Sequence, residues 1–282
     1  MKNLNSYFTL SNGYKIPVVG FGTWQSSEGE IAYNAVSEAL KSGYTHIDTA
    51  AAYGNEVSVG RAVKDSGRAR EEIFITSKLW NTNRGYDTTL AAAEKTCRKL
   101  GVYYLDLYLI HWPAVKKQFD NWDKVNLDTW RAITRLYKEG VFRAIGVSNF
   151  MPHHLNSLME TEIPPMVNQI EYHPGFMQKY TVDYCKKHNI LVEAWSPLGT
   201  GRMLNNEVLK EIAEKYGRSV AQICIRWALQ NGALPLPKSV TPGRIAENIN
   251  VFDFEISDND MAIINKLPDF GSSGFNPDDI DF

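Results

Sequence analysis

The chain has 282 residues, of which 44% are hydrophobic and 22% are charged, so it is long enough to bury a full core. Its formal net charge of -2 argues against the strongly basic surface that binds nucleic acid or an anionic membrane. No segment approaches the ~20 consecutive apolar residues of a membrane span, and the first residues lack the apolar run of a signal peptide. We therefore expect a monomeric cytoplasmic protein with small-molecule partners.

Three cysteines, Cys97, Cys185 and Cys224, lie far apart and form neither a CxxC pair nor a Cys/His cluster. This spacing argues against a disulfide framework and against a structural zinc site. The expectation is three buried thiols in a reducing compartment and no bound metal.

The first predicted element is a β-hairpin, in which Asn12 and Gly13 supply a favoured two-residue turn. Eight short runs rich in β-branched residues follow, and segments with helical periodicity separate them. These eight strands are predicted at 18–23, 46–50, 73–79, 105–112, 144–149, 167–172, 191–196 and 235–239.

Two of the helical segments carry start signals. Ser27 and Glu30 have the spacing of a capping box before the first helix, and Gly43 suits the end of that helix. Ser219 and Gln222 repeat the capping-box spacing before a later helix. Both pairs therefore predict a helix N-terminus.

Eight β/α units within one chain, with no low-complexity linker, predict a single domain over residues 1–282. Each strand is too apolar to have a solvent-facing side, which favours a closed (β/α)8 TIM barrel of the α/β class. An open doubly wound sheet is the alternative. The N-terminal hairpin and a short C-terminal tail over the mouth complete the predicted architecture.

Polar side chains stand at the predicted strand ends, where such barrels build their sites. Taken singly, each has a structural explanation, such as a turn residue or a hydrogen-bonded core histidine. Their convergence on one mouth favours a functional explanation. These residues are Asp48, Lys78, His111, Ser148, Asn149, Gln169, Trp195, Ser196, Lys238 and Ser239.

Three of these side chains, together with Tyr53, suggest a proton donor. A tyrosine is a poor acid at neutral pH unless a cation such as Lys78 stabilises its phenolate. A buried lysine needs a counter-ion to stay charged, and Asp48 is the candidate. His111 is suited to donate a hydrogen bond to a substrate oxygen. A carbonyl that gains a proton on oxygen must also gain a hydride on carbon, which points to a nicotinamide.

The whole chain resembles the aldo-keto reductase family, and three segments match that family's signatures. They are GYTHIDTAAAYGNEVSVG (43–60), VFRAIGVSNF (141–150) and LPKSVTPGRIAEN (236–248). Shorter matches, SKLW, LIHWP, NQIEYHP and AWSPLG, extend the resemblance from Gly20 to about Phe254. Within the family, the chain is similar to microbial carbonyl reductases such as diketogluconate reductases and to prostaglandin F synthase-like members.

The resemblance implies an NADPH-binding (β/α)8 barrel that reduces aldehydes or ketones to alcohols without a metal. It places the family's catalytic tetrad on Asp48, Tyr53, Lys78 and His111, with Tyr53 as the general acid in reduction. The cofactor, NADPH or NADP+, is expected to lie across the mouth without a Rossmann unit.

The same resemblance assigns cofactor-binding residues. Ser148, Asn149 and Gln169 match the partners of the nicotinamide carboxamide, and Trp195 matches the aromatic residue that stacks on the ring. Near Lys238, Thr241 and Pro242 have the pattern of a helix start that faces an anion. The full expected set is Gly22, Thr23, Asp48, Ser148, Asn149, Gln169, Trp195, Ser196, Leu198, Lys238, Ser239, Arg244 and Asn248.

For the substrate, the resemblance implies an aromatic pocket formed by Trp24, Trp80 and Trp112, together with Tyr53 and His111. The segment 113–126 and the tail 271–282 are expected to cover the mouth. Because the tail is short, we expect an open pocket that accepts small dicarbonyls or keto sugars.

Two alternative functions remain at this point. One is a nicotinamide-binding sensor or regulatory subunit on the same fold with little turnover. The other is a barrel lyase or isomerase that uses Tyr53 and Lys78 without a nicotinamide.

Overall fold

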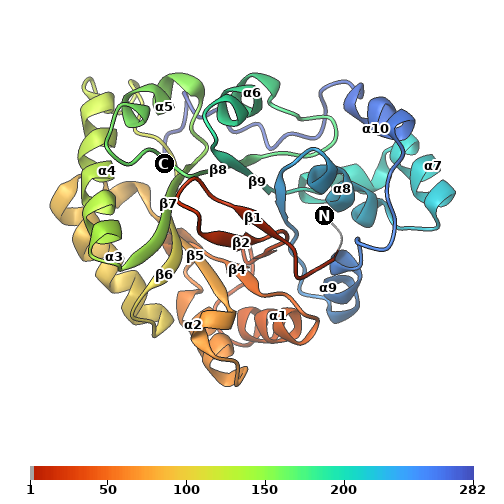
Figure 1. Cartoon of the computed structure of the whole chain (residues 1–282), viewed down its shortest axis with the longest axis horizontal. Helices are drawn as coiled ribbons and strands as arrows, with labels where there is room; N and C mark the ends of the chain where they lie inside the picture. Colours follow the sequence, from red (N-terminus) through yellow and green to blue (C-terminus); the bar gives the residue numbers. More distant parts are fainter. Residues whose placement is uncertain (1–2) are drawn as a thin grey trace.

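The structure is a computed structural model that describes residues 3–282 (Figure 1). It begins with the predicted hairpin, in which β1 (Tyr7–Thr9) pairs antiparallel with β2 (Lys15–Pro17). Asn12 Nδ2 donates to the Arg143 carbonyl at 3.0 Å, and Tyr14 Oη donates to Asp106 Oδ1 at 2.7 Å. Since Arg143 and Asp106 lie near the beginnings of two barrel strands, the hairpin covers the amino-terminal end of the barrel.

Eight parallel strands form the main sheet, which confirms the predicted number of strands and their direction. Each strand pairs with the next one along the chain, in the order β3 to β10. Their bounds are β3 Phe21–Gly22, β4 His46–Asp48, β5 Phe74–Leu79, β6 Leu105–Ile110, β7 Phe142–Ser148, β8 Val167–Glu171, β9 Leu191–Trp195 and β10 Leu234–Leu236.

Backbone hydrogen bonds between the first and last strands complete the ring. The Gly20 N–H donates to the Pro235 carbonyl at 3.1 Å, and the Gly22 N–H donates to the Pro237 carbonyl at 3.0 Å. The sheet is therefore a barrel, and the predicted alternative of an open doubly wound sheet is wrong.

Helices surround the barrel, as Figure 1 shows, and among residues 3–282 none is both long and apolar enough to cross a membrane. The α-helices are α1 Glu30–Lys41, α2 Glu56–Asp65, α3 Tyr86–Leu100, α4 Trp122–Lys138, α5 Pro152–Met159, α6 Lys179–Lys187, α7 Glu207–Tyr216, α8 Val220–Gln230, α9 Pro242–Ile249 and α10 Asp258–Asn265. Four 3-10 turns are η1 Ala51–Tyr53, η2 Arg70–Glu72, η3 Asn81–Asn83 and η4 Gly199–Asn205.

One of the two predicted capping boxes is confirmed. Before α8, the Ser219 side chain accepts from the Gln222 N–H, and the Gln222 side chain accepts from the Ser219 N–H. The prediction at Ser27 is wrong, because α1 starts after Gly29, which has φ 96° and no side-chain cap. The Gly29 N–H instead donates to Ser58 Oγ of α2 at 2.8 Å, so a tertiary contact fixes this helix start.

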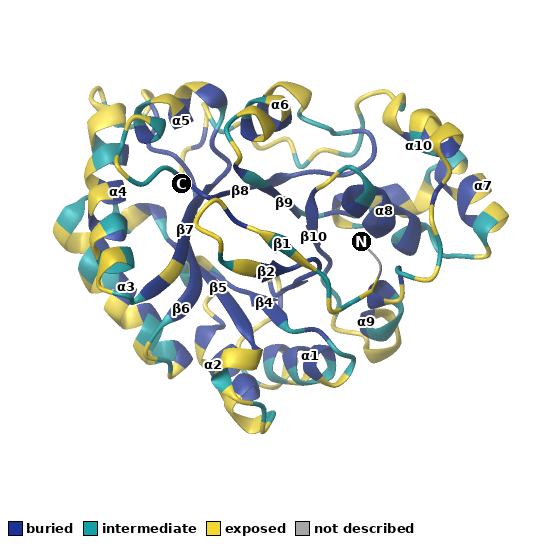
Figure 2. Cartoon of the chain, viewed as in Figure 1, coloured by how far each residue is buried: buried dark blue, intermediate teal, exposed yellow. Residues whose placement is uncertain are grey.

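The core occupies the barrel interior and the layer between the strands and the helices (Figure 2). The eight barrel strands are almost entirely buried, and most helices expose their outer faces, whereas α8 is buried along nearly its whole length. Parallel strands covered in this way carry near-continuous apolar runs, and polar residues within them therefore need a local explanation.

Candidate active site

A cavity of about 1030 Å³ opens at the carboxyl end of the barrel. Its wall includes every predicted site residue except Thr23 and Lys78. These wall residues are Gly22, Trp24, Asp48, Tyr53, Trp80, His111, Trp112, Ser148, Asn149, Gln169, Trp195, Ser196, Leu198, Lys238, Ser239, Arg244 and Asn248.

The structure does not bring Thr23 to the cavity. Its side chain is completely buried, and its Oγ1 and its backbone N–H both donate to the Asp48 carbonyl at 3.0 Å. Thr23 therefore ties β3 to the end of β4, and its expected contact with the cofactor stays a prediction.

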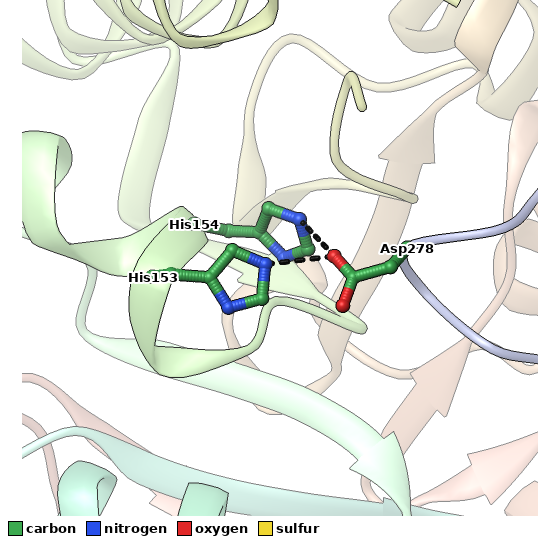
Figure 3. Close-up of side chains that lie close together, drawn as sticks. All are labelled: His153, His154 and Asp278. Atoms are coloured by element: carbon green, nitrogen blue, oxygen red, sulfur yellow. Dashed lines mark hydrogen bonds and ion pairs between the residues drawn. The ribbon is translucent and has the colours of Figure 1, made fainter. Parts of the chain in front are cut away.

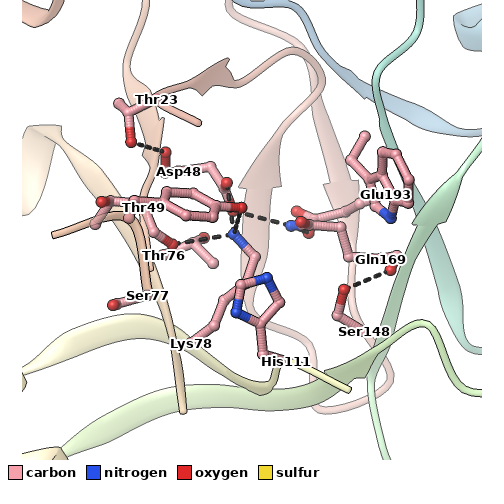
Figure 4. Close-up of polar contacts among 12 residues, drawn as sticks. Thr23, Asp48, Thr49, Thr76, Ser77, Lys78, His111, Ser148, Gln169 and Glu193 are labelled. Carbon is pink, nitrogen blue, oxygen red and sulfur yellow. Dashed lines mark hydrogen bonds and ion pairs between the residues drawn. The ribbon is translucent and has the colours of Figure 1, made fainter. Parts of the chain in front are cut away.

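Lys78 lies beneath the cavity floor at the centre of a polar cluster (Figure 4). Its Nζ donates to Asp48 Oδ1 at 2.6 Å, to the Thr49 carbonyl at 3.0 Å and to Tyr53 Oη at 3.3 Å. The Lys78 side chain is 0% exposed and that of Asp48 is 4% exposed. Because each ammonium hydrogen has an acceptor and a carboxylate lies in contact, the lysine can remain charged without water.

The local chain path brings Tyr53 back over this floor. β4 ends at Asp48, and after two intervening residues the short turn η1 runs from Ala51 to Tyr53. Gly54 then takes a left-handed conformation with φ 69°, which only glycine adopts without strain, and α2 begins two residues later. The five-residue spacing between Asp48 and Tyr53 therefore places both side chains on Lys78.

The protonation states follow from burial and from the charge pair. Burial raises the pKa of the Tyr53 phenol above its ordinary value, and the Lys78 ammonium opposes this rise only in part. Lys78 thus lowers the pKa of Tyr53, as predicted, although the net change in this pKa is upward. Burial alone would lower the pKa of Lys78, but the Asp48 carboxylate and Tyr53 together raise it. At neutral pH the site therefore combines a protonated phenol with a charged ammonium.

His111 lies beside Tyr53, with ring centroids 5.6 Å apart and an interplanar angle of 75°. Burial, aided by the Lys78 charge, lowers the pKa of His111 well below its ordinary value, so the imidazole is neutral. Its Nδ1 is buried and accepts no hydrogen bond from any residue in 3–282. A neutral imidazole carries one N–H. When this proton is on Nε2, it can be donated to a ligand oxygen in the cavity.

The far wall is a hydrogen-bonded set from β7, β8 and β9. Ser148 Oγ donates to the Gln169 carbonyl at 2.7 Å, and Asn149 Nδ2 donates to the His111 carbonyl at 3.0 Å. Trp195 Nε1 donates to Asn149 Oδ1 at 2.8 Å, which fixes the orientation of the indole. Most polar atoms of Asn149 are therefore used within the protein, whereas the face of Trp195 remains part of the wall.

Cationic groups line the opposite end of the cavity, around the start of α9. Pro242 is the first residue of this helix and Thr241 is its N-cap, as predicted. Lys238 Nζ donates only to the Gln25 carbonyl, at 3.1 Å, and exposed Arg244 forms no ion pair within residues 3–282. Two cations that no acidic side chain of the described residues contacts, beside a helix N-terminus, suit a phosphate group.

The C-terminal tail covers the mouth, as predicted, and adds two aromatic residues that the sequence did not single out. The ring of Phe282 stacks on Trp80, with centroids 5.7 Å apart and planes 6° apart. Phe275 and Phe282 both meet Trp112 edge-on, and both line the cavity. Their aromatic character was the available signal, but their partners lie far away in the sequence.

A cluster of His153, His154 and Asp278 fastens this tail to the start of α5 (Figure 3). His153 Nε2 and His154 Nε2 lie 2.7 and 3.0 Å from Asp278 Oδ1. Although the spacing would suit a metal, His154 Nδ1 accepts the Met151 N–H, so its Nε2 carries the proton and donates to Asp278. Burial lowers the pKa of His154 to about 4, which agrees with a neutral ring. The cluster is therefore a clasp between the tail and α5.

Two further segments of the cavity wall were missed. One is the start of α8, where Ser219, Val220 and Ala221 line the cavity, and the other is η4, which contributes Thr200, Gly201 and Leu204. The capping box at Ser219 marked a helix start, but it did not show that this helix faces the mouth.

Comparisons with known proteins agree on one family. The model of the aldo/keto reductase family matches residues 18–269. A glyoxal reductase from Bacillus subtilis (strain 168) is 51% identical over 281 residues, which cover 99% of each chain. An aldo-keto reductase enzyme from a Medee basin deep-sea metagenome library has a similar structure, with a TM-score of 0.92 and 47% identity over 98% of this chain and 100% of that one. A mutant of Gox0644 in complex with NADPH has a TM-score of 0.90 and 42% identity over 98% of this chain and 99% of that one.

Proposed function

The chain belongs to the aldo/keto reductase family, and from that premise we propose that it reduces small aldehydes, above all α-dicarbonyls of the glyoxal type. The reaction class is the family's NADPH-dependent reduction of a carbonyl to an alcohol. The observation that carries the proposal is the buried contact of Lys78 with Asp48 and Tyr53 at the cavity floor. The alternative of a sensor with little turnover receives no support from the relatives, which are named as reductases.

The cavity has the groups that a phosphorylated dinucleotide needs. Lys238 and Arg244 are cations that form no ion pair with an acidic residue among residues 3–282. They lie beside the start of α9, with Ser239 and Asn248 as neutral neighbours. Gln169 and Trp195 offer an amide and an aromatic face at the other end of the cavity. These residues would hold NADPH, which when bound supplies a hydride to the carbonyl carbon.

Tyr53 would supply the proton for the carbonyl oxygen. Its phenol keeps that proton at neutral pH because burial raises the pKa, and Lys78 at 3.3 Å stabilises the phenolate left after transfer. His111 would hold the same carbonyl oxygen through its N–H. The carbonyl thus gains one proton from Tyr53 and one hydride, and it becomes an alcohol.

The pocket walls favour small substrates. Trp80, Trp112 and Tyr53 come from three different strand ends, and the tail lays Phe282 flat on Trp80. We expect glyoxal and methylglyoxal to be reduced with a higher kcat/KM than a bulky diaryl ketone. The test is the rate of NADPH oxidation with each compound at equal concentration. A preference for the diaryl ketone would contradict the proposed substrate class.

We also expect one chain to act as a single domain and a monomer. One continuous cluster of buried residues runs from Leu10 to Ile264, which suits a single domain. The free thiols of Cys97, Cys185 and Cys224 and the net charge of -2 suit a cytoplasmic protein without a nucleic-acid partner.

Arg244→Ala is expected to weaken NADPH binding about ten- to hundredfold and to leave NADH binding nearly unchanged. The two cofactors differ by one phosphate, and charge-assisted contacts to a phosphate contribute roughly 1.5 to 3 kcal/mol each. Arg244→Lys keeps the charge but loses the planar guanidinium group. Its affinity for NADPH should therefore lie between those of the wild-type protein and Arg244→Ala. Dissociation constants from fluorescence titration check this. Equal weakening of both cofactors would mean that Arg244 supports the loop and does not read the phosphate.

A further inference from the structure

Glu193 is a fully buried carboxyl group to which the mechanism above gives no role. It lies in β9 with 0% of its surface exposed, and its Oε2 accepts a hydrogen bond from Gln169 Nε2 at 2.8 Å. Its Oε1 has no hydrogen-bond partner among residues 3–282. A buried carboxyl with one free oxygen is costly, particularly when charged, so its presence within an apolar strand needs an explanation.

The amide of Gln169 connects Glu193 to Asp48 at the cavity floor (Figure 4). The nitrogen that donates to Glu193 also donates to Asp48 Oδ2 at 2.9 Å, so both of its hydrogens are used. If the amide were turned over, its oxygen would face the Asp48 carboxylate, which can only accept hydrogen bonds. Asp48 and Glu193 together therefore fix the orientation of Gln169, whose oxygen remains as the acceptor for a ligand in the cavity that this residue lines.

Building on the proposed function, we propose that Glu193 is a positioning residue for the nicotinamide end of the cofactor. It holds the Gln169 amide in one orientation, and its protonation state sets the relative affinity of the site for oxidised and reduced cofactor. The chemical basis is that the oxidised nicotinamide ring carries a positive charge, whereas the reduced ring is neutral. A negative charge on Glu193 therefore favours the oxidised form.

The surroundings of Glu193 place its proton loss slightly above neutral pH. Burial, together with the Asp48 carboxylate, raises the pKa of Glu193 to about 8, although the Gln169 hydrogen bond and the Lys78 charge oppose the rise. The two adjacent strands place Gln169 and Leu234 opposite Glu193, and neither residue titrates. The charged groups that act on Glu193 are thus Asp48 on β4 and Lys78 on β5. Glu193 is neutral below about pH 8 and becomes charged above it.

The test is the ratio of the dissociation constants of NADP+ and NADPH, measured by calorimetry between pH 6.5 and pH 9.5. The ratio is informative because both cofactor forms carry the same ionisable phosphates, so the effect of phosphate ionisation on binding cancels. In the wild-type protein, the affinity for NADP+ should increase about tenfold relative to the affinity for NADPH as the pH rises from 6.5 to 9.5. This change equals ~1.4 kcal/mol, about the interaction of two unit charges ~10 Å apart inside a protein.

Glu193→Gln separates this role from a merely structural one. The variant keeps a carbonyl that can accept from Gln169 but cannot ionise, so its ratio should stay flat with pH. Glu56→Gln is the matched control, because Glu56 is another buried carboxyl, bonded to Ser77 Oγ at 2.9 Å, and its variant should keep the wild-type dependence. Infrared pH-difference spectra of the cofactor-free protein should show a protonated carboxyl band that Glu193→Gln removes.

Three results would overturn the inference. They are a flat ratio in the wild-type protein, an unchanged dependence in Glu193→Gln, and an infrared spectrum without a carboxyl band assignable to Glu193. Failure of the proposed function is distinguishable, because then neither NADP+ nor NADPH would bind to any variant. That outcome would overturn both proposals, although the infrared band would still report on the proton of Glu193.

Discussion

Tyr53→Phe is expected to lower kcat for carbonyl reduction by a factor on the order of 10² to 10⁴, the usual loss when a positioned acid is removed. The phenol is the group that contacts Lys78 and faces the cavity, and phenylalanine has no proton to give. The fold should be preserved, because within residues 3–282 the hydroxyl has one side-chain hydrogen bond, to Lys78. Steady-state kinetics with methylglyoxal, together with NADPH titration, provide the measurement.

The dissociation constant of NADPH should change by less than about threefold in Tyr53→Phe, because the assigned cofactor contacts lie on other residues. Tyr184→Phe is a matched control, since it removes the same hydroxyl from α6, where it donates to Asn156 at 2.9 Å. This control should keep the wild-type rate. A Tyr53→Phe protein that retained most of its turnover would show that another group donates the proton.

Lys78→Met is expected to abolish measurable reduction and also to destabilise the fold. Without the ammonium, the pKa of Tyr53 rises further and its phenolate loses its stabilising charge. Asp48 is left as a buried carboxylate without its counter-ion, and removing one partner of such a pair typically costs 3 to 5 kcal/mol. Denaturant unfolding and steady-state kinetics measure the two effects separately.

The double variant Lys78→Met with Asp48→Asn distinguishes the two consequences. Replacing the carboxylate removes the unpaired charge, so this variant should recover most of the lost stability and none of the activity. Recovery of both would mean that Lys78 acts only through the fold. A stable but inactive single variant would show that water or another group compensates for the charge of Asp48.

The barrel could be predicted from the sequence because each of its signals is local. Short apolar runs alternate with helical patterns, and every predicted strand overlaps an observed one, from β3 at Phe21–Gly22 to β10 at Leu234–Leu236. The capping box at Ser27 failed because Gly29 binds Ser58 of α2, a contact that no local pattern encodes. The box at Ser219 succeeded because both of its partners lie within the same turn.

The site was predictable to the extent that it lies at strand ends. Lys78, Asp48 and Tyr53 do meet, and the cations near α9 do face the cavity. The direction of the Tyr53 pKa shift was missed, because the loss of water around the phenol outweighs the charge of Lys78. Glu193 was also missed, since its link to Asp48 through Gln169 depends on which strands face each other inside the barrel.

The most direct test of the central claim is the oxidation of NADPH by methylglyoxal in the presence of the purified protein. The absorbance band of reduced nicotinamide should disappear, and one molecule of alcohol should form for each molecule of NADPH consumed. The wild-type protein should do this without added metal, and Tyr53→Phe should not do it at a comparable rate. If the wild-type protein consumed no NADPH with any small aldehyde, or consumed it without forming an alcohol, the protein would not be the carbonyl reductase proposed.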